Sequence, residues 1–149
     1  MDVEKIDSVL SSTEFPDATT GGCVSFAVAL DNVVGVEYFP CAFDPYDDSK
    51  PLHCMSVISG VVFDADGAHG TDPTYVQEWW SGLKPNNFSW VVREAERGGR
   101  DPGEIMFEYL QEDYYSNIPS QRGVRNLGAR DTDVQRYEQL LREALEDNN

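Results

Sequence analysis

Apolar residues recur at helical spacing in the segment that follows two consecutive glycines. The stripe consists of Cys23, Phe26, Ala27 and Leu30, at positions i, i+3, i+4 and i+7. Gly21 and Gly22 interrupt the chain just before the stripe. The pattern therefore predicts a helix that begins near Cys23 and ends near Asn32.

A second apolar stripe predicts a long helix at the C-terminal end. Its members are Val134, Tyr137, Leu141 and Leu145. We expect Asp131 to cap this helix, with Glu138 and Arg142 as a supporting pair four residues apart. Shorter helices are predicted around 3–10, over 101–115, and over 72–82, where Pro73 occupies the first turn.

The remaining segments predict strands and loops. Runs rich in β-branched and aromatic residues predict a strand over 33–39, and they are compatible with a strand or a helix over 87–95, where the strand is favoured. "DPYDDSKP" (44–51) has the composition of an acidic loop, and the Gly-rich segment 119–130 that of a second loop. The mixture predicts an α+β fold in which helices flank a small antiparallel sheet.

"LHCMSVISGVVFDADG" (52–67) predicts a β-hairpin with Ser59-Gly60 as its two-residue turn. In that register Ile58 faces Val61, His53 faces Asp66, and Met55 faces Asp64. Side chains alternate along a strand, so His53, Asp64 and Asp66 are expected on one face. Either carboxylate would then lie close enough to orient the imidazole.

Length and charge narrow the classes of protein. The chain has 149 residues and is most simply a single domain, 1–149. It carries 27 acidic and 11 basic residues, a net charge of −16. A surface so negative argues against direct nucleic-acid or anionic-membrane binding. The N-terminal segment has no secretory signal pattern, so a cytoplasmic location is expected.

The three cysteines, Cys23, Cys41 and Cys54, lack Cys-x-x-Cys spacing. That count and spacing argue against a disulfide scaffold or a structural zinc site. "DADGAHGTD" (64–72) lacks the third acid and the terminal Glu of a calcium loop. We therefore expect no metal and no cofactor. Cys41 and Cys54 are interpreted as structural, with Cys54 facing away from His53.

Two interpretations of Cys23 are open. A cysteine in the apolar stripe of a helix is commonly a buried core residue. At the first turn of a helix, however, free N–H groups favour the thiolate, and a nearby histidine could take its proton. The preceding glycines would let a substrate backbone approach and leave the Cys23 N–H available to an oxyanion.

"GGCVSFAVAL" followed by "LHCMSVISGVVFDADG" resembles small papain-like cysteine peptidase domains of phage, plasmid and polymorphic-toxin contexts. The resemblance covers about residues 20 to 80. It implies a papain-like fold with Cys23 as nucleophile, His53 as general base and Asp64 as orienting acid, with Asp66 as the alternative acid.

The same resemblance implies a downstream aromatic residue, Trp79 or Trp80. Papain's oxyanion glutamine has no equivalent here, so Thr20 or backbone N–H groups beside Gly22 would serve instead. Residues 81–149 match no part of the pattern and are interpreted as a helical and loop extension.

Two hypotheses follow. The first is a cysteine hydrolase or acyl transferase that acts on a peptide, isopeptide or amide bond of a protein or peptide substrate. The second is a catalytically silent, acidic binding or inhibitor protein, encoded by a virus or plasmid, that acts on a basic partner in the host cytoplasm.

Overall fold

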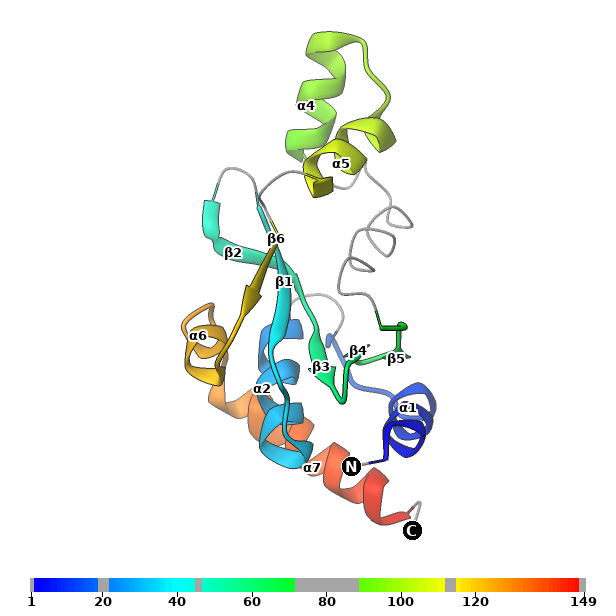
Figure 1. Cartoon of the computed structure of the whole chain (residues 1–149). Helices are drawn as coiled ribbons and strands as arrows, with labels where there is room; N and C mark the ends of the chain where they lie inside the picture. Colours follow the sequence, from blue (N-terminus) through cyan, green and yellow to red (C-terminus); the bar gives the residue numbers. More distant parts are fainter. Residues whose placement is uncertain (1, 19–21, 45–46, 72–88, 112–114, 148–149) are drawn as a thin grey trace.

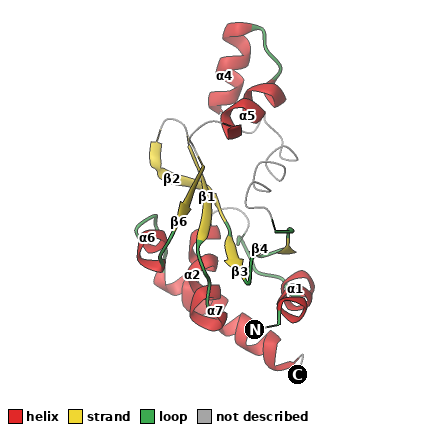
Figure 2. Cartoon of the chain, viewed as in Figure 1, coloured by secondary structure: helices red, strands yellow, loops and turns green. Residues whose placement is uncertain are grey.

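The computed structural model describes residues 2–18, 22–44, 47–71, 89–111 and 115–147. The elements of these ranges are, in chain order, α1 (Val3–Ser12), α2 (Cys23–Val34), β1 (Phe39–Asp44), β2 (Asp47–Cys54), β3 (Ser56–Ile58), β4 (Val61–Asp64), β5 (Gly67–Ala68), α4 (Ser89–Gly98), α5 (Pro102–Gln111), β6 (Tyr115–Ile118), α6 (Gln121–Arg125) and α7 (Asp131–Asp147). The fold is α+β, as the sequence predicts (Figures 1 and 2). The helix expected over 72–82 lies outside the described residues.

Two small antiparallel sheets are present among the described strands, with strand orders β2-β1-β6 and β3-β4-β5. The chain passes from the first sheet to the second at Met55, which lies between β2 and β3. The Met55 N–H donates to the Pro40 carbonyl at 2.8 Å, and the Val57 N–H donates to the Tyr38 carbonyl at 2.9 Å. Residues 53–57 therefore lie beside β1 and Tyr38, the residue that precedes β1. Within this stretch, β3 also pairs with β4 on its other side.

The predicted hairpin turn is confirmed. Ile58 lies opposite Val61, and the turn residues Ser59 and Gly60 have φ of 50° and 77°. The ladder ends at Ser56, which faces Phe63. The expectation that the same register continues to His53 and Met55 is wrong, because the Met55 N–H pairs with the neighbouring strand.

His53 instead lies opposite Ala42 in the first sheet, and Cys54 lies opposite Cys41. β2 thus belongs to the sheet with β1 and β6 and not to the hairpin. As a result, His53 and Asp64 come from different sheets.

Helix α2 is largely buried in the core of the protein. Every residue from Cys23 to Leu30 is buried, and the helix packs against α6, α7, β2 and β3. Its start at Cys23 is as predicted, but it ends at Val34 and so includes part of the strand expected over 33–39. Gly35, with φ of 82°, terminates it, and the Asp31 carboxylate accepts from the Val36 N–H at 2.7 Å.

Two predicted irregular segments contain regular structure. The acidic loop expected over 44–51 lies largely in β2, and α6 interrupts the loop expected over 119–130. Ser120 caps α6 by accepting from the Gly123 N–H at 3.3 Å.

Of the two interpretations of 87–95, the favoured strand is wrong and the helix is correct, because α4 occupies Ser89–Gly98. Val91 is buried while Arg93, Glu94 and their charged neighbours are exposed, which is a helical and not a strand periodicity. Helix α5 confirms most of the helix predicted over 101–115, but Tyr115 begins β6 instead. Helix α5 packs against α4 (Figure 1).

Helix α7 confirms the predicted C-terminal helix. Its buried residues are Val134, Tyr137 and Leu141, and Asp131 is its first residue and not its cap. The Tyr137 ring makes edge contacts with Phe15 and Phe26, with centroid distances of 6.5 and 5.7 Å. These rings join α7 to α2 and to the segment after α1. Within the described ranges, no helix is long and apolar enough to cross a membrane.

Candidate active site

Cys23 is the first residue of α2, and its side chain is buried with 4% exposed. The helical hydrogen bonds begin with the Phe26 N–H, which donates to the Gly22 carbonyl at 2.9 Å. Gly22 has no side chain to cap the helix. The positive end of the helix dipole and the first-turn N–H groups of Cys23 to Ser25 therefore lie beside the sulfur.

Gly22 is required for close packing. A Cβ at this position would collide with the Tyr137 hydroxyl and would lie 2.9 Å from the Asp17 carbonyl oxygen. The space on that side is therefore filled by α7 and by the segment before α2. The expected approach of a substrate backbone beside the two glycines stays a prediction, because Gly21 lies outside the described residues.

His53 and Asp64 form a buried pair. His53 Nε2 lies 3.3 Å from Asp64 Oδ2, and the two residues are 0% and 3% exposed. His53 comes from the C-terminal end of β2, and Asp64 is the last residue of β4. The two residues that the resemblance pairs are therefore brought together, although by a register different from the expected one.

The second oxygen of Asp64 has partners of its own. Oδ1 lies 2.6 Å from His69 Nε2 and accepts from the Asp66 backbone N–H at 2.9 Å. Asp66 itself is exposed. Of the two candidate acids, Asp64 is thus the one whose carboxylate contacts His53.

These contacts determine how Asp64 ionises. Burial alone would raise the pKa of Asp64, but hydrogen bonds from His53 and His69 outweigh it and hold that pKa well below its usual range. Asp64 is therefore a carboxylate between two histidines, with one oxygen within hydrogen-bond distance of each Nε2.

Cys23 and His53 each shift the pKa of the other. Hydrogen bonding from Cys54 lowers the pKa of Cys23 most; burial opposes this, and hydrogen bonding and charge from His53 lower it further. Burial acts to lower the pKa of His53, but hydrogen bonds with Asp64 and Cys23 raise it above its usual value. Both shifts favour a Cys23 thiolate beside a protonated His53.

Cys54, which the sequence analysis interprets as structural, also contacts the site through Cys23. Its sulfur lies 2.8 Å from that of Cys41, its cross-strand partner, and it also hydrogen bonds to Cys23. These bonds, together with burial, raise the pKa of Cys54 well above its usual value. Cys54 is the last residue of β2 and pairs with Cys41 next to the His53–Ala42 pair.

Two other candidate residues, Thr20 and Trp79, lie outside the described residues, as does Trp80. Over the ranges that the structure describes, no group of three or more His, Cys, Asp or Glu side chains is arranged to hold a metal ion.

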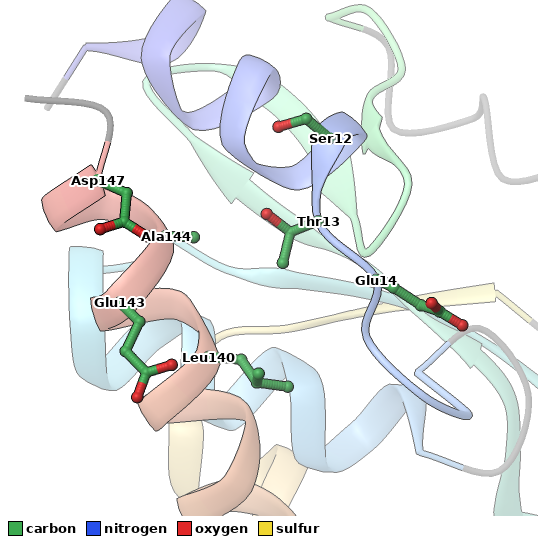
Figure 3. Close-up of a pocket in the computed structure, with 7 residues that line it drawn as sticks. All are labelled: Ser12, Thr13, Glu14, Leu140, Glu143, Ala144 and Asp147. Atoms are coloured by element: carbon green, nitrogen blue, oxygen red, sulfur yellow. The ribbon is translucent and has the colours of Figure 1, made fainter.

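A separate groove of about 380 Å³ lies between the end of α1 and the last turns of α7 (Figure 3). Leu140 and Ala144 form its apolar part, and Glu14, Glu143 and Asp147 surround it with carboxylates. None of its lining residues belongs to the Cys23–His53–Asp64 site.

Comparisons with protein-family models, with curated proteins and with solved structures find no match.

Proposed function

We propose that this chain is a papain-like cysteine hydrolase or acyl transferase acting on a peptide, isopeptide or amide bond. One observation carries the proposal: a buried histidine is held by a carboxylate at 3.3 Å, and it lies close enough to the thiol at the start of α2 to lower the pKa of that thiol. That order, Cys23 to His53 to Asp64, is the order that nucleophilic catalysis by cysteine requires.

The contact with Asp64 supports different roles for the two ring nitrogens of His53. Nε2 donates its proton to the Asp64 carboxylate, so Nδ1 is the nitrogen that takes the proton of the Cys23 thiol. Asp64 fixes this tautomer and stabilises the imidazolium that forms. His69 and the Asp66 N–H hold the carboxylate from its other oxygen.

In the proposed reaction the Cys23 thiolate attacks the substrate carbonyl carbon. N–H groups of the first turn of α2 stabilise the oxyanion of the tetrahedral intermediate. His53 then gives its proton to the leaving amine, and an acyl-enzyme remains on Cys23. Attack by water completes hydrolysis, and attack by an amine completes acyl transfer.

The test is labelling by a peptide that carries a thiol-directed electrophile, such as a vinyl sulfone, with the labelled residue identified by mass spectrometry. Labelling is expected at Cys23 and is expected to disappear in Cys23→Ala. Asp64→Asn should label more slowly, whereas the matched variant Asp66→Asn should label as the parent does, because only the backbone of Asp66 contacts the site. Undiminished labelling of a folded Cys23→Ala protein would contradict the proposal.

The burial of Cys23 favours a second candidate, an acidic binding protein without turnover. With 4% of this residue exposed, a substrate carbonyl has little access to the sulfur. A net charge of −16 suits a partner with a basic surface. This candidate is supported if Cys23 labels only after denaturation while the native protein binds a cationic protein in a salt-dependent way.

We also propose a cytoplasmic location, or the host cytoplasm if the chain is encoded by a virus. Cys23, Cys41 and Cys54 are all free thiols. Such thiols persist in a reducing compartment. Retention of a tagged full-length chain in the soluble cytoplasmic fraction would support this location, and its export would contradict it.

A further inference from the structure

Cys54 lies at the centre of a three-sulfur cluster formed by all the cysteines of the chain. Its sulfur is 2.8 Å from Cys41 Sγ, and its thiol is close enough to that of Cys23 for each to shift the pKa of the other. The three residues are 4%, 0% and 3% exposed for Cys23, Cys41 and Cys54. The proposed hydrolase uses the thiol of Cys23 alone, so it gives no role to the thiols of Cys41 and Cys54.

The Cys41–Cys54 pair has the placement that a disulfide requires. The two residues are direct partners across the antiparallel strands β1 and β2. Such partners have Cα atoms about 4.5 or 5.5 Å apart, and both values fall in the range of roughly 4.4–6.8 Å found for disulfides. The sulfurs therefore need only a small approach, from 2.8 Å to about 2.05 Å.

We infer that the three cysteines form a thiol relay in which a small hydroperoxide oxidises Cys23 and the oxidation passes through Cys54 to a Cys41–Cys54 disulfide. The relay uses the same Cys23 thiolate as the proposed hydrolase but needs no acyl substrate. It can therefore be tested independently of the hydrolase. It goes beyond the proposed function, because it gives the chain a peroxide-reducing activity and a reversible modification site.

The first step oxidises the Cys23 sulfur by two electrons. The thiolate attacks one oxygen of hydrogen peroxide, the O–O bond breaks, and Cys23 becomes a sulfenic acid. The hydroxide that leaves takes a proton from His53 and becomes water. All three sulfurs are buried, so the oxidant must be small, and hydrogen peroxide is little larger than water.

The next steps move the oxidation between sulfurs. Cys54 loses its proton and attacks the Cys23 sulfur; the S–O bond breaks, and the hydroxide that leaves is protonated to a second water. Cys41 then loses its proton and attacks the Cys54 sulfur, which breaks the Cys23–Cys54 bond and releases Cys23 as a thiolate. In sum, one hydrogen peroxide and the two thiols of Cys41 and Cys54 give one disulfide and two waters.

The direction of the last step follows from the leaving groups. The sulfur between the other two is Cys54, so Cys41 can attack it while Cys23 departs. A thiol with a lowered pKa leaves faster in such an exchange, and among these three Cys23 has that property. The relay therefore ends with Cys23 returned to its thiolate and protected from irreversible oxidation.

The experiment uses the full chain, reduced, freed of reductant and kept with a chelator so that no metal masks the thiols. After equimolar hydrogen peroxide, the remaining thiols are alkylated and chymotryptic peptides are analysed by mass spectrometry. Cleavage sites such as Tyr38 and Phe43 lie between the cysteines, so each sulfur is assigned separately. The expected result is a Cys41–Cys54 disulfide with Cys23 alkylated, reversed by an external dithiol.

Variants separate the steps. Cys41→Ser should stop at a Cys23–Cys54 disulfide, and Cys54→Ser should leave a Cys23 sulfenic acid that reacts with dimedone. In Cys23→Ala the Cys41–Cys54 disulfide should form at least about ten-fold more slowly, because the reactive thiolate is gone. Circular dichroism of each reduced variant verifies that it is folded.

The relay is overturned if the parent chain accumulates over-oxidised Cys23 without a disulfide, or if Cys23→Ala forms the Cys41–Cys54 disulfide as fast as the parent. Neither outcome bears on hydrolysis, which the vinyl sulfone experiment tests. A chain that forms the disulfide but does not label with the peptide probe retains the relay and loses the hydrolase.

Discussion

His53 Nε2 lies 3.3 Å from Asp64 Oδ2, although the two residues belong to different sheets. Each is almost fully buried, and each depends on the other to remain charged. The pair therefore contributes to stability as well as to the proposed chemistry, and its removal has consequences that can be measured.

Asp64→Asn removes the negative charge between His53 and His69. Loss of one partner of a buried charged pair typically costs about 3 kcal/mol, and the free energy of unfolding is expected to fall by this order. Chemical denaturation at neutral pH measures it. Asp66→Asn, at an exposed position with only a backbone contact to Asp64, is the control and should leave the stability unchanged.

The same variant predicts a pH dependence. The pKa of Asp64 is lower in the folded than in the unfolded chain, so its stabilisation is present above the unfolded pKa, about 3.9, and is lost as the pH falls towards the folded pKa. The stability difference between the parent and Asp64→Asn should therefore shrink as the pH falls below about 4. A difference that grows in acid would contradict this assignment.

The reactivity of Cys23 is expected to depend on Cys54. Hydrogen bonding from Cys54 is the largest cause that lowers the pKa of Cys23, so Cys54→Ala should raise that pKa. The measurement is the pH profile of Cys23 alkylation by iodoacetamide. The parent midpoint should lie below the value of about 8.5 for a free thiol, and the alanine variant should shift towards it.

Cys54→Ser is the matched control for that profile, because its hydroxyl can still donate a hydrogen bond to Cys23. Its midpoint should remain close to that of the parent. Equal shifts in the serine and alanine variants would show that packing, and not hydrogen bonding, sets the reactivity of Cys23.

Gly22→Ala tests the packing of the segment just before the proposed nucleophile. The added Cβ would collide with the Tyr137 hydroxyl and approach the Asp17 carbonyl, although φ of −99° suits alanine. Overpacking of this kind costs about 1–3 kcal/mol, which thermal or chemical unfolding would detect.

Tyr137→Phe supplies the second arm of a double-mutant cycle. It removes the hydroxyl that would collide, so the two substitutions together should cost less than the sum of their separate effects. Strict additivity would mean that the Tyr137 hydroxyl does not restrict this position.

Gly67→Ala is expected to disturb the strand that precedes His69. Gly67 has φ of 124°, and a Cβ there would lie 2.6 Å from Asp7 Oδ1, the atom that accepts from the Ala68 N–H at 2.8 Å. Backbone strain of this kind costs of order 1–3 kcal/mol, and the collision with Asp7 adds to it.

Gly60→Ala is the comparison for Gly67→Ala. Its φ is also positive, at 77°, but nothing lies within 4 Å of the added Cβ. It should therefore show the backbone cost alone, about 1–2 kcal/mol. If the two variants are equally destabilised, the contact with Asp7 has no role in holding β5.

The sequence predicts the local features of the site well. Cys23 begins its helix as the apolar stripe and the preceding glycines indicate, and Ile58 pairs with Val61 across the Ser59-Gly60 turn. Both features depend on the spacing and turn chemistry of residues that are close together in the chain, so a single sequence is enough to predict them.

Features that depend on distant partners were missed. The strand was predicted over 33–39, whereas β1 spans Phe39–Asp44. Without the correct position of β1, no feature of the nearby sequence predicts that Cys41 pairs with Cys54. The register of His53 was wrong for the same reason, since the Met55 N–H pairs with Pro40 from β1 and not with the hairpin. His69 has no periodicity to place it beside Asp64, because it follows the short strand β5 in a glycine-rich loop.

The change of sheet at Met55 has a consequence for the order of folding. His53, the proposed base, belongs to the sheet that includes β6, a strand far from β2 along the chain, whereas Asp64, the proposed orienting acid, belongs to a hairpin that pairs locally. Local hairpins form early, whereas contacts between distant segments wait for loop closure. A nascent chain can therefore have Asp64 in place before His53 is fixed, so reactivity that depends on both would appear only when the last sheet closes.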